Sequence, residues 1–342
     1  MSSSRDLSPL DVPFFPRIFL RNQFFTKPQY PPPSTNLSGS VAIVTGGNSG
    51  LGFEAARQLL SFSLSRLILA IRSADKGEAA ATKLRELNPK ATIEFWLLDM
   101  SLYSSIQDFA RRVEIQLPRL DVVILNAGII PLKFRTVPST GHEEIIQINY
   151  LSTVLLASLL LPTLKNKSPP KGPGRLTIIN AALSLTAKFP VVSPLLKALD
   201  DPKQFNPETQ YNLSKALAHM FIWKLVDYVS VDDVIVNIVG LGFVGGTELA
   251  RDVTGISRIF FKVFAALTAL NLRDGASCYL DAAVVKEKES HGSYIMSWKV
   301  APFNEFLYTP NGKETIASVW EETMSELEFA DVRGILNSMK MH

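Results

Sequence analysis

A tyrosine and a lysine in YNLSK (211–215) form the side-chain pair of this sequence best suited to moving a proton. Residues four apart lie on the same side of an α-helix, so Tyr211 and Lys215 are expected to face one site. A phenol with a pKa of about 10 is a poor acid or base at neutral pH unless a nearby positive charge favours the phenolate. The pair predicts general acid–base chemistry at an oxygen atom.

A glycine-rich stretch, TGGNSGLG (45–52), follows an apolar run at 40–46 and precedes a helical pattern at 51–60. Glycines let the backbone approach a pyrophosphate, and a helix N-terminus offers N–H groups and a positive dipole. In this strand–loop–helix context the stretch predicts a dinucleotide site rather than an ordinary turn. The residues expected to hold the phosphates are Gly46, Asn48, Ser49, Gly50, Leu51 and Gly52.

The end of the second predicted strand bears on the choice of cofactor. The adenosine ribose of a dinucleotide lies near this strand end, where an acid would bond a 2′-hydroxyl and an arginine suits a 2′-phosphate. The sequence offers Arg72 and Lys76 and no acid directly after the strand, which predicts NADP(H). Asp99 is placed to accept from the adenine amino group, and Asn126, Ala127 and Gly128 provide close backbone approach.

Alternating strands and helices are expected to position these residues. The predicted strands are at 40–46, 66–72, 92–100, 120–128, 175–181 and 234–240, and the predicted helices at 51–60, 75–88, 104–116, 143–164 and 213–229. Strands apolar on both faces and separated by helices indicate a parallel sheet covered on both sides. We therefore expect a doubly wound, Rossmann-like α/β fold in one domain at 40–342, preceded by an N-terminal arm at 1–39 with many prolines and phenylalanines.

Composition narrows the class of protein. Lys+Arg 35 against Asp+Glu 32 gives a net charge of +3 without a basic block, so nucleic acid is not an expected partner. A lone cysteine, Cys278, and the lack of a secretory signal predict a soluble, cytoplasmic protein without a membrane span. The scattered His142, His219, His291 and His342 predict no metal site.

The motifs TGGNSGLG, Arg72, LLDM with Asp99, LNAG (125–128), INY with Asn149 and YNLSK occur in the order of the short-chain dehydrogenase/reductase family. The chain resembles this family over about residues 38–300, and PPPSTNLSG and WEET (320–323) resemble its long fungal members, often found in secondary metabolism. The resemblance implies that Tyr211 exchanges a proton with a carbonyl or alcohol oxygen. Lys215 would hold the nicotinamide ribose and lower the Tyr211 pKa, and Asn149 would anchor a water.

Two positions depart from the family pattern. The family's serine, six residues after the arginine of the fifth strand, is here Ala181. After the sixth strand, Leu241 replaces the usual proline, so we expect a more mobile loop there. By resemblance, Val244 and Thr247 in this loop bond the nicotinamide amide.

Three explanations of Ala181 stay open. Ser184 or Asn180 could contact the substrate oxygen in place of the serine, or the substrate could carry its own donor. In the third, the fold catalyses an isomerisation, dehydration or cyclisation without net redox change. The leading hypothesis is an NADP(H)-dependent oxidoreductase, and the alternatives are the redox-silent catalyst and a non-catalytic cofactor-binding module.

The expected pocket has two walls, an insertion at 182–210 that forms a rim and a substrate lid at about 245–275. The lid's apolar residues follow helical spacing, which suits a bulky apolar substrate, core packing or shallow membrane contact. They are Ile256, Ile259, Phe260, Val263, Phe264 and Leu267. A homodimer through the helices at 145–164 and 213–229 is also left open, because burial within one chain would explain their apolar character equally well.

Overall fold

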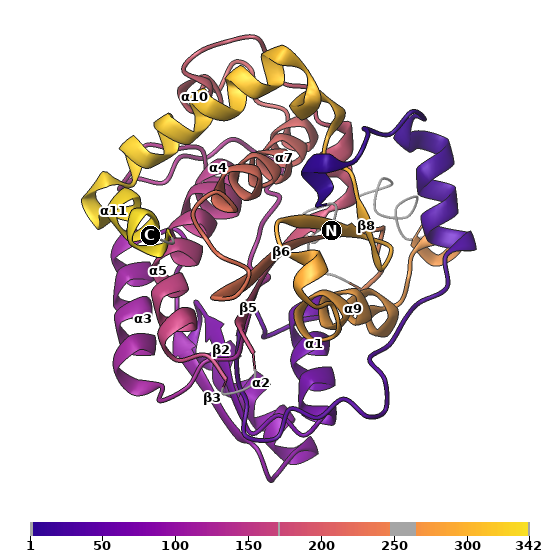
Figure 1. Cartoon of the computed structure of the whole chain (residues 1–342), viewed down its shortest axis with the longest axis vertical. Coiled ribbons are helices and arrows are strands. Elements are labelled where there is room, and N and C mark those ends of the chain that lie inside the picture. Colours follow the sequence, from indigo (N-terminus) through magenta and orange to yellow (C-terminus); the bar gives the residue numbers. More distant parts are fainter. Residues whose placement is uncertain (1–2, 170–171, 247–264, 341–342) are drawn as a thin grey trace.

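The computed structural model describes residues 3–169, 172–246 and 265–340, and in these ranges the chain forms one eight-stranded sheet (Figure 1). The strand order is β3-β2-β1-β4-β5-β6-β7-β8, with all pairs parallel except β7 with β8. The strands are β1 (Val41–Thr45), β2 (Arg66–Ile71), β3 (Thr92–Leu97), β4 (Val122–Leu125), β5 (Gly174–Ala181), β6 (Val234–Leu241), β7 (Ser293–Met296) and β8 (Lys299–Ala301). The predicted doubly wound fold is confirmed.

The order of the strands reverses between β1 and β4. From β1 the chain proceeds outward through β2 to β3, and it then returns to β4 on the other side of β1. Open parallel sheets bind ligands outside the carboxyl ends of the strands at such a switch point. The predicted site residues follow the carboxyl ends of β1, β2, β3, β4, β5 and β6.

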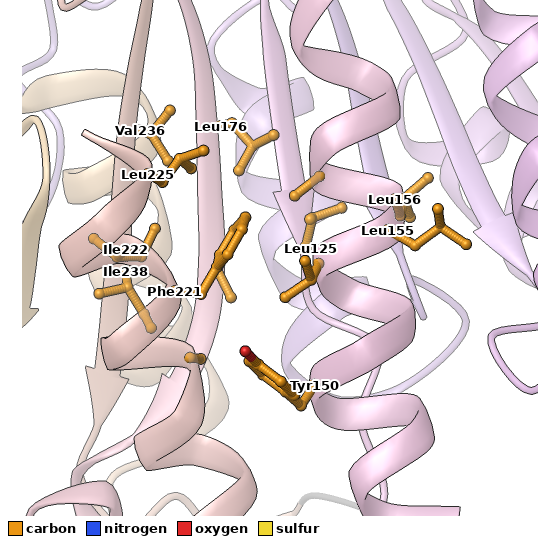
Figure 2. Packing of buried hydrophobic residues seen from close by; sticks show 14 of the residues in the cluster. Leu125, Tyr150, Leu155, Leu156, Leu176, Phe221, Ile222, Leu225, Val236 and Ile238 are labelled. Atoms are coloured by element: carbon orange, nitrogen blue, oxygen red, sulfur yellow. The ribbon is translucent and has the colours of Figure 1, made fainter. Parts of the chain in front are cut away.

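Helices cover both faces of the sheet, and each face has its own hydrophobic cluster. On one face lie α1 (Gly50–Ser61), α2 (Ala74–Leu87) and α9 (Leu272–Leu280). On the other lie α3 (Tyr103–Gln116), α5 (Ser152–Asn166) and α7 (Pro207–Leu225). Figure 2 shows Tyr150, Leu155 and Phe221 from this second face packed with Leu125 and Leu176 from the strands.

Local sequence explains two details that position the site. The side chain of Asn206 accepts a hydrogen bond from Thr209 N, and Pro207 occupies the first turn, so α7 begins six residues before the predicted start at 213. Tyr211 therefore lies well inside the helix. The predicted helix at 143–164 is divided into α4 (Glu144–Ile146), a π-helical turn (Gln147–Leu151) and α5, and the turn contains Asn149.

The sequence interpretation left out the elements after residue 270, except for noting WEET. The chain adds α9, β7, β8, α10 (Pro310–Glu326) and α11 (Val332–Met339). Helix α10 packs on α7, and α11 packs on α5 (Figure 1). Every residue from 210 to 222 is buried, so α7 has no exposed face over that length.

The stretch Glu144–Asn166 is the only one in the described residues that is long and apolar enough to cross a membrane. Of its most apolar window, 89% is buried inside the protein, which is typical of a core helix. The N-terminal arm also packs on the domain: the Ser4 hydroxyl donates to Ala301 O and accepts from Tyr294 N, and Ile18 is 1% exposed. Phe24 and Phe25 of the arm are 50% and 80% exposed, so contact of the arm with a membrane stays a prediction.

Candidate active site

Tyr211, Lys215 and Asn149 come together beside the carboxyl ends of β4 and β5. Both α7 side chains are 7% exposed, and Lys215 Nζ lies 5.7 Å from the centroid of the Tyr211 ring. Lys215 Nζ donates to Ile179 O of β5 at 3.0 Å. A side chain at Gly128 would have its Cβ 3.2 Å from Asn149 Oδ1 and 3.5 Å from Lys215 Nζ, so this glycine keeps the space before the lysine open.

Asn149 has a structural task in this arrangement. Its side chain donates to Ile129 O at 3.0 Å and accepts from Ile129 N at 2.9 Å, which fixes the segment after β4. Asn149 Nδ2 also donates to Ser214 Oγ at 3.2 Å, and Ser214 Oγ donates to Tyr211 O at 2.7 Å. The π-helical turn is thereby tied to the helix that carries Tyr211.

Burial dominates the proton affinities of the pair. It raises the pKa of Tyr211 to about 12 and lowers the pKa of Lys215 to about 8. Burial is the cause of both shifts, since it disfavours the charged form of each group. Tyr211 is consequently a neutral phenol at pH 7, able to donate a hydrogen bond to an oxygen atom.

Ala181 ends β5 and pairs with Leu241 of β6, close to this pair of side chains. The two polar residues considered as replacements for the missing serine, Asn180 and Ser184, both make hydrogen bonds within the protein. Asn180 is 4% exposed, its Oδ1 accepts from Ala181 N at 2.7 Å, and its Nδ2 donates to Lys215 O at 2.8 Å. Asn180 thus joins the end of β5 to α7.

Ser184 is fully buried, and its hydroxyl lies 3.2 Å from His219 Nε2. Burial lowers the pKa of His219 to about 3, so its ring is neutral. Since His219 Nδ1 accepts from Asn304 N at 3.4 Å, Nε2 carries the ring proton and donates to Ser184 Oγ. Ser184 is held away from any substrate by its burial, and Asn180 by its two hydrogen bonds to Ala181 N and Lys215 O, so either residue would have to move to replace the serine hydroxyl.

The glycine-rich loop has the shape of a phosphate cradle. Gly46 and Gly50 have φ values of +65° and +55°, a conformation that side chains disfavour. A Cβ at Gly52 would lie 2.5 Å from Asn126 Nδ2 and 2.6 Å from Gly46 O, so only glycine fits there. Within the described residues Ser49 makes no side-chain cap, which leaves the first amides of α1 available to an anion. These features fit the pyrophosphate of a dinucleotide. Asn48 and Leu51 lie in the same loop and first turn.

Asn126 holds this loop, and one of its partners, Tyr279, was not expected from the sequence. Its Nδ2 donates to Thr45 O at 2.9 Å, and its Oδ1 accepts from the hydroxyl of Tyr279 at 2.8 Å. Tyr279 lies on α9 and is 1% exposed. Ala127 N donates to Thr45 Oγ1 at 2.9 Å, so the β1 and β4 loops are joined directly.

Arg72, Lys76 and Asp99 follow the carboxyl ends of β2 and β3. Arg72 and Lys76 are exposed, and within residues 3–169, 172–246 and 265–340 neither pairs with a carboxylate. Both are available to a 2′-phosphate. Asp99 Oδ1 accepts from Ser101 N at 2.9 Å and Ser101 Oγ at 2.7 Å, which closes a turn before α3.

The loop after β6 makes contacts that the sequence did not predict. Val244 is 7% exposed and bridges to Leu270, while Gln23 of the N-terminal arm bonds the backbone of Phe243 on both N and O. The expectation of a mobile loop did not include this contact with the arm. Thr247 and most of the proposed lid lie outside the described residues; Leu267, within them, is 71% exposed.

The insertion at 182–210 serves two purposes. Its segment Leu195–Leu199 packs into the core, where Glu322 of WEET accepts from Leu195 N at 3.0 Å and Leu196 N at 2.8 Å. Its first part instead borders a half-open cavity of about 250 Å³ that the N-terminal arm lines on one side. The walls of this cavity include Val12, Phe14 and Ile18 of the arm and Leu185, Thr186 and Ala187 after β5.

The fold is a doubly wound α/β sheet with a glycine-rich loop that suits a dinucleotide and a tyrosine–lysine pair that suits proton transfer. A family model described as short chain dehydrogenase matches residues 40–190. The chain is 63% identical over 342 residues to the short chain dehydrogenase/reductase mfmJ of Annulohypoxylon moriforme, with 99% of both chains covered. It is 40% identical to the short chain dehydrogenase virL of Hypocrea virens over 94% of both chains.

A solved structure, the RhlG/NADP active-site complex of Pseudomonas aeruginosa, shares the fold with a TM-score of 0.59 at 21% identity. The match covers 77% of this chain and 96% of that one. The chain belongs to the short-chain dehydrogenase/reductase family, a family of oxidoreductases that bind nicotinamide cofactors.

Proposed function

We propose that the protein is an NADP(H)-dependent reductase or dehydrogenase acting on a carbonyl or alcohol of a bulky apolar substrate. The observation that supports it best is the convergence of Tyr211, Lys215, Gly128 and Asn149 beside a loop in which only glycine fits at position 52. Relatives at 63% and 40% identity are named as short-chain dehydrogenases, which supports the same reaction class.

Tyr211 supplies the proton in this proposal. With a pKa of about 12 its phenol stays protonated at neutral pH, so it donates to the oxygen of a bound carbonyl. Lys215, with a pKa of about 8, carries a positive charge at pH 7 next to the developing negative charge. Asn180 fixes the backbone of Lys215, and Asn149 fixes the neighbouring β4 loop. The reduced nicotinamide, when bound, supplies the hydride.

The preference for NADP(H) rests on Arg72 and Lys76. Both are exposed where the adenosine ribose of a dinucleotide lies, and a guanidinium suits the 2′-phosphate that distinguishes NADP from NAD. A structural neighbour is described as an NADP complex, in line with this preference. Arg72→Gln should weaken NADPH binding by about tenfold or more and leave NADH binding nearly unchanged, because one charge-assisted contact is lost. Equal changes for both cofactors would contradict the assignment.

The apolar substrate is suggested by the cavity between the arm and the segment after β5. Thr186, in its wall, accepts a hydrogen bond from Asn212 Nδ2 at 3.1 Å, and Asn212 is adjacent to Tyr211. Phenylalanine, leucine and isoleucine side chains line much of this cavity, together with the charged Lys188 and Glu305. Such a surface suits a hydrophobic intermediate of secondary metabolism.

The redox-silent alternative is favoured by one specific observation. Ala181 has no hydroxyl, Ser184 is fully buried, and the Asn180 side chain is hydrogen-bonded to Ala181 N and Lys215 O. The loss of one hydrogen-bond donor to a substrate oxygen can reduce a rate by about 10² to 10³. An isomerisation, dehydration or cyclisation that does not need this donor would explain the substitution.

NADPH oxidation with 1-naphthaldehyde, 2-decanone and further bulky apolar carbonyls tests these functions. The wild type, Ala181→Ser, Tyr211→Phe and the control Tyr228→Phe would be compared. A reductase should oxidise NADPH, lose at least about 100-fold in rate in Tyr211→Phe and keep its rate in Tyr228→Phe. Turnover only after Ala181→Ser would favour the redox-silent catalyst. Full activity of Tyr211→Phe would overturn the proposed proton donor.

A further inference from the structure

The side chain of Gln23 joins the N-terminal arm to the loop after β6. Its Nε2 donates to Phe243 O at 2.8 Å and to Thr268 O at 2.6 Å, and its Oε1 accepts from Phe243 N at 3.0 Å. Gln23 is 7% exposed, so water competes little for these three bonds. A carboxamide that donates to the C=O and accepts from the N–H of the same residue fixes the backbone orientation of that residue.

The geometry around Gly242 shows that this contact is closely fitted. A Cβ built at Gly242 would collide with Gln23 Oε1, so the loop has a glycine where the arm's carboxamide approaches its backbone. Residues 242 and 23 are far apart in sequence. The contact thus requires both the carboxamide of Gln23 in the arm and a glycine at position 242 in the loop.

The loop held by Gln23 borders the site of the cofactor. Phe243 precedes Val244, and the side chains of Val244 and Leu51 both lie within 3 Å of where a Cβ at Gly275 would be. Leu51 belongs to the first turn after the phosphate cradle. Gly245 N donates to Leu270 O, and Leu270 N donates to Phe243 O, both at 2.9 Å, so the loop has a defined backbone conformation.

We propose that Gln23 is a positioning residue for cofactor binding. Its carboxamide holds Gly242–Val244 in the conformation that receives the nicotinamide end of NADP(H), a task for which the family pattern has a proline at the position of Leu241. The inference rests on the proposed function, since it assumes that this loop contacts NADP(H). It makes the N-terminal arm a part of the active site rather than a linker.

Gln23→Met is the decisive variant, because methionine keeps the length of the side chain and removes all three bonds. Asn22→Leu is the matched control: Asn22 is the neighbouring carboxamide, 3% exposed, and its two polar atoms have no hydrogen-bond partner within the described residues. Binding of NADPH would be followed by its own fluorescence, and binding of 2′,5′-ADP, the adenosine half of the cofactor, by calorimetry.

We expect Gln23→Met to raise the Kd for NADPH by about tenfold, as when the loop spends only about a tenth of the time in its binding conformation. The Kd for 2′,5′-ADP should stay the same, because this fragment does not reach the loop. Asn22→Leu should bind both ligands like the wild type. Adding Leu241→Pro to Gln23→Met should restore part of the NADPH affinity.

Several results would overturn the inference. If Gln23→Met binds NADPH as tightly as the wild type, the loop does not need the hydrogen bonds of Gln23. Equal weakening for NADPH and 2′,5′-ADP, or the same weakening in Asn22→Leu, would indicate general damage to the fold. If Gln23→Met does not fold, Gln23→Glu, which keeps the acceptor and loses both donors, takes its place with the same criteria. A wild type that binds neither ligand would refute the proposed function, and the inference with it.

Discussion

Lys215, the lysine of the proposed proton-transfer pair, is expected to destabilise the folded protein. Lys215 is 7% exposed, and the one hydrogen-bond partner of its ammonium group in the described residues is the neutral carbonyl of Ile179. Burial lowers its pKa from the ordinary 10.5 to about 8. Because the unfolded chain binds the proton more tightly, holding the charged form in the folded protein costs about 3 kcal/mol at pH 7.

Lys215→Met removes this cost and keeps most of the side-chain volume. Loss of the bond to Ile179 O offsets about 1 kcal/mol, so the variant should be more stable by about 2 kcal/mol at pH 7. For a chain of 342 residues this corresponds to a melting temperature about 3 °C higher. The same variant should lose catalysis and the affinity of the nicotinamide ribose.

The pH dependence distinguishes this explanation from an improvement in packing. Between pH 8 and pH 10.5 the unfolded wild type binds a proton that the folded protein lacks, so wild-type stability gains on the variant as the pH rises. At pH 9.5 the cost of the buried charge falls to about 1 kcal/mol, and the advantage of Lys215→Met should nearly disappear.

Thermal unfolding followed by circular dichroism at pH 7 and pH 9.5 measures both effects. Lys83→Met is the matched control, since Lys83 is an exposed helical lysine on α2 and should show no difference at either pH. A Lys215→Met protein less stable than the wild type at pH 7 would refute the argument. So would a gain in stability of the same size at both pH values.

Three further predictions follow from other parts of the molecule. Gly52→Ala should abolish measurable NADPH binding, because its Cβ would lie 2.5 Å from Asn126 Nδ2. If a fluorescence titration showed that the variant binds NADPH as tightly as the wild type, the glycine-rich loop would not be the phosphate site. His142 is held between Asp200 and Glu326, and the hydrogen bonds to these carboxylates raise its pKa to about 9. The stabilisation of the folded state by His142, of order 1–3 kcal/mol, should be complete below pH 6.5 and lost as the pH rises through 9. Denaturant unfolding should therefore show that His142→Gln loses most stability relative to the wild type below pH 6.5. A loss of stability that does not depend on pH would exclude the charged histidine as its cause. The protein should be a monomer by light scattering after size-exclusion chromatography, because α10 and α11 cover the helices considered for a dimer; a dimer mass would contradict this.

The fold and the order of its site motifs were predictable because the signals are short-range. Apolar runs separated by helical patterns predict a parallel sheet, and TGGNSGLG between a strand and a helix predicts the cradle. The boundaries were less accurate: α7 begins at Pro207, and Asn149 lies in a π-helical turn inside a helix predicted as continuous. The last two strands, β7 and β8, were not predicted.

By itself the sequence determined the doubly wound sheet, the family and the set of polar residues that could form the site. These depend on periodicity, on glycine's backbone freedom and on motif spacing, all local properties of the chain. The tertiary structure decided that Gln23 holds the loop after β6, that Ser184 is bonded to His219, and that burial sets the pKa values of Tyr211 and Lys215. Residues far apart in sequence meet only when the core packs, and that packing fixes which polar groups lose water and which partners they find instead.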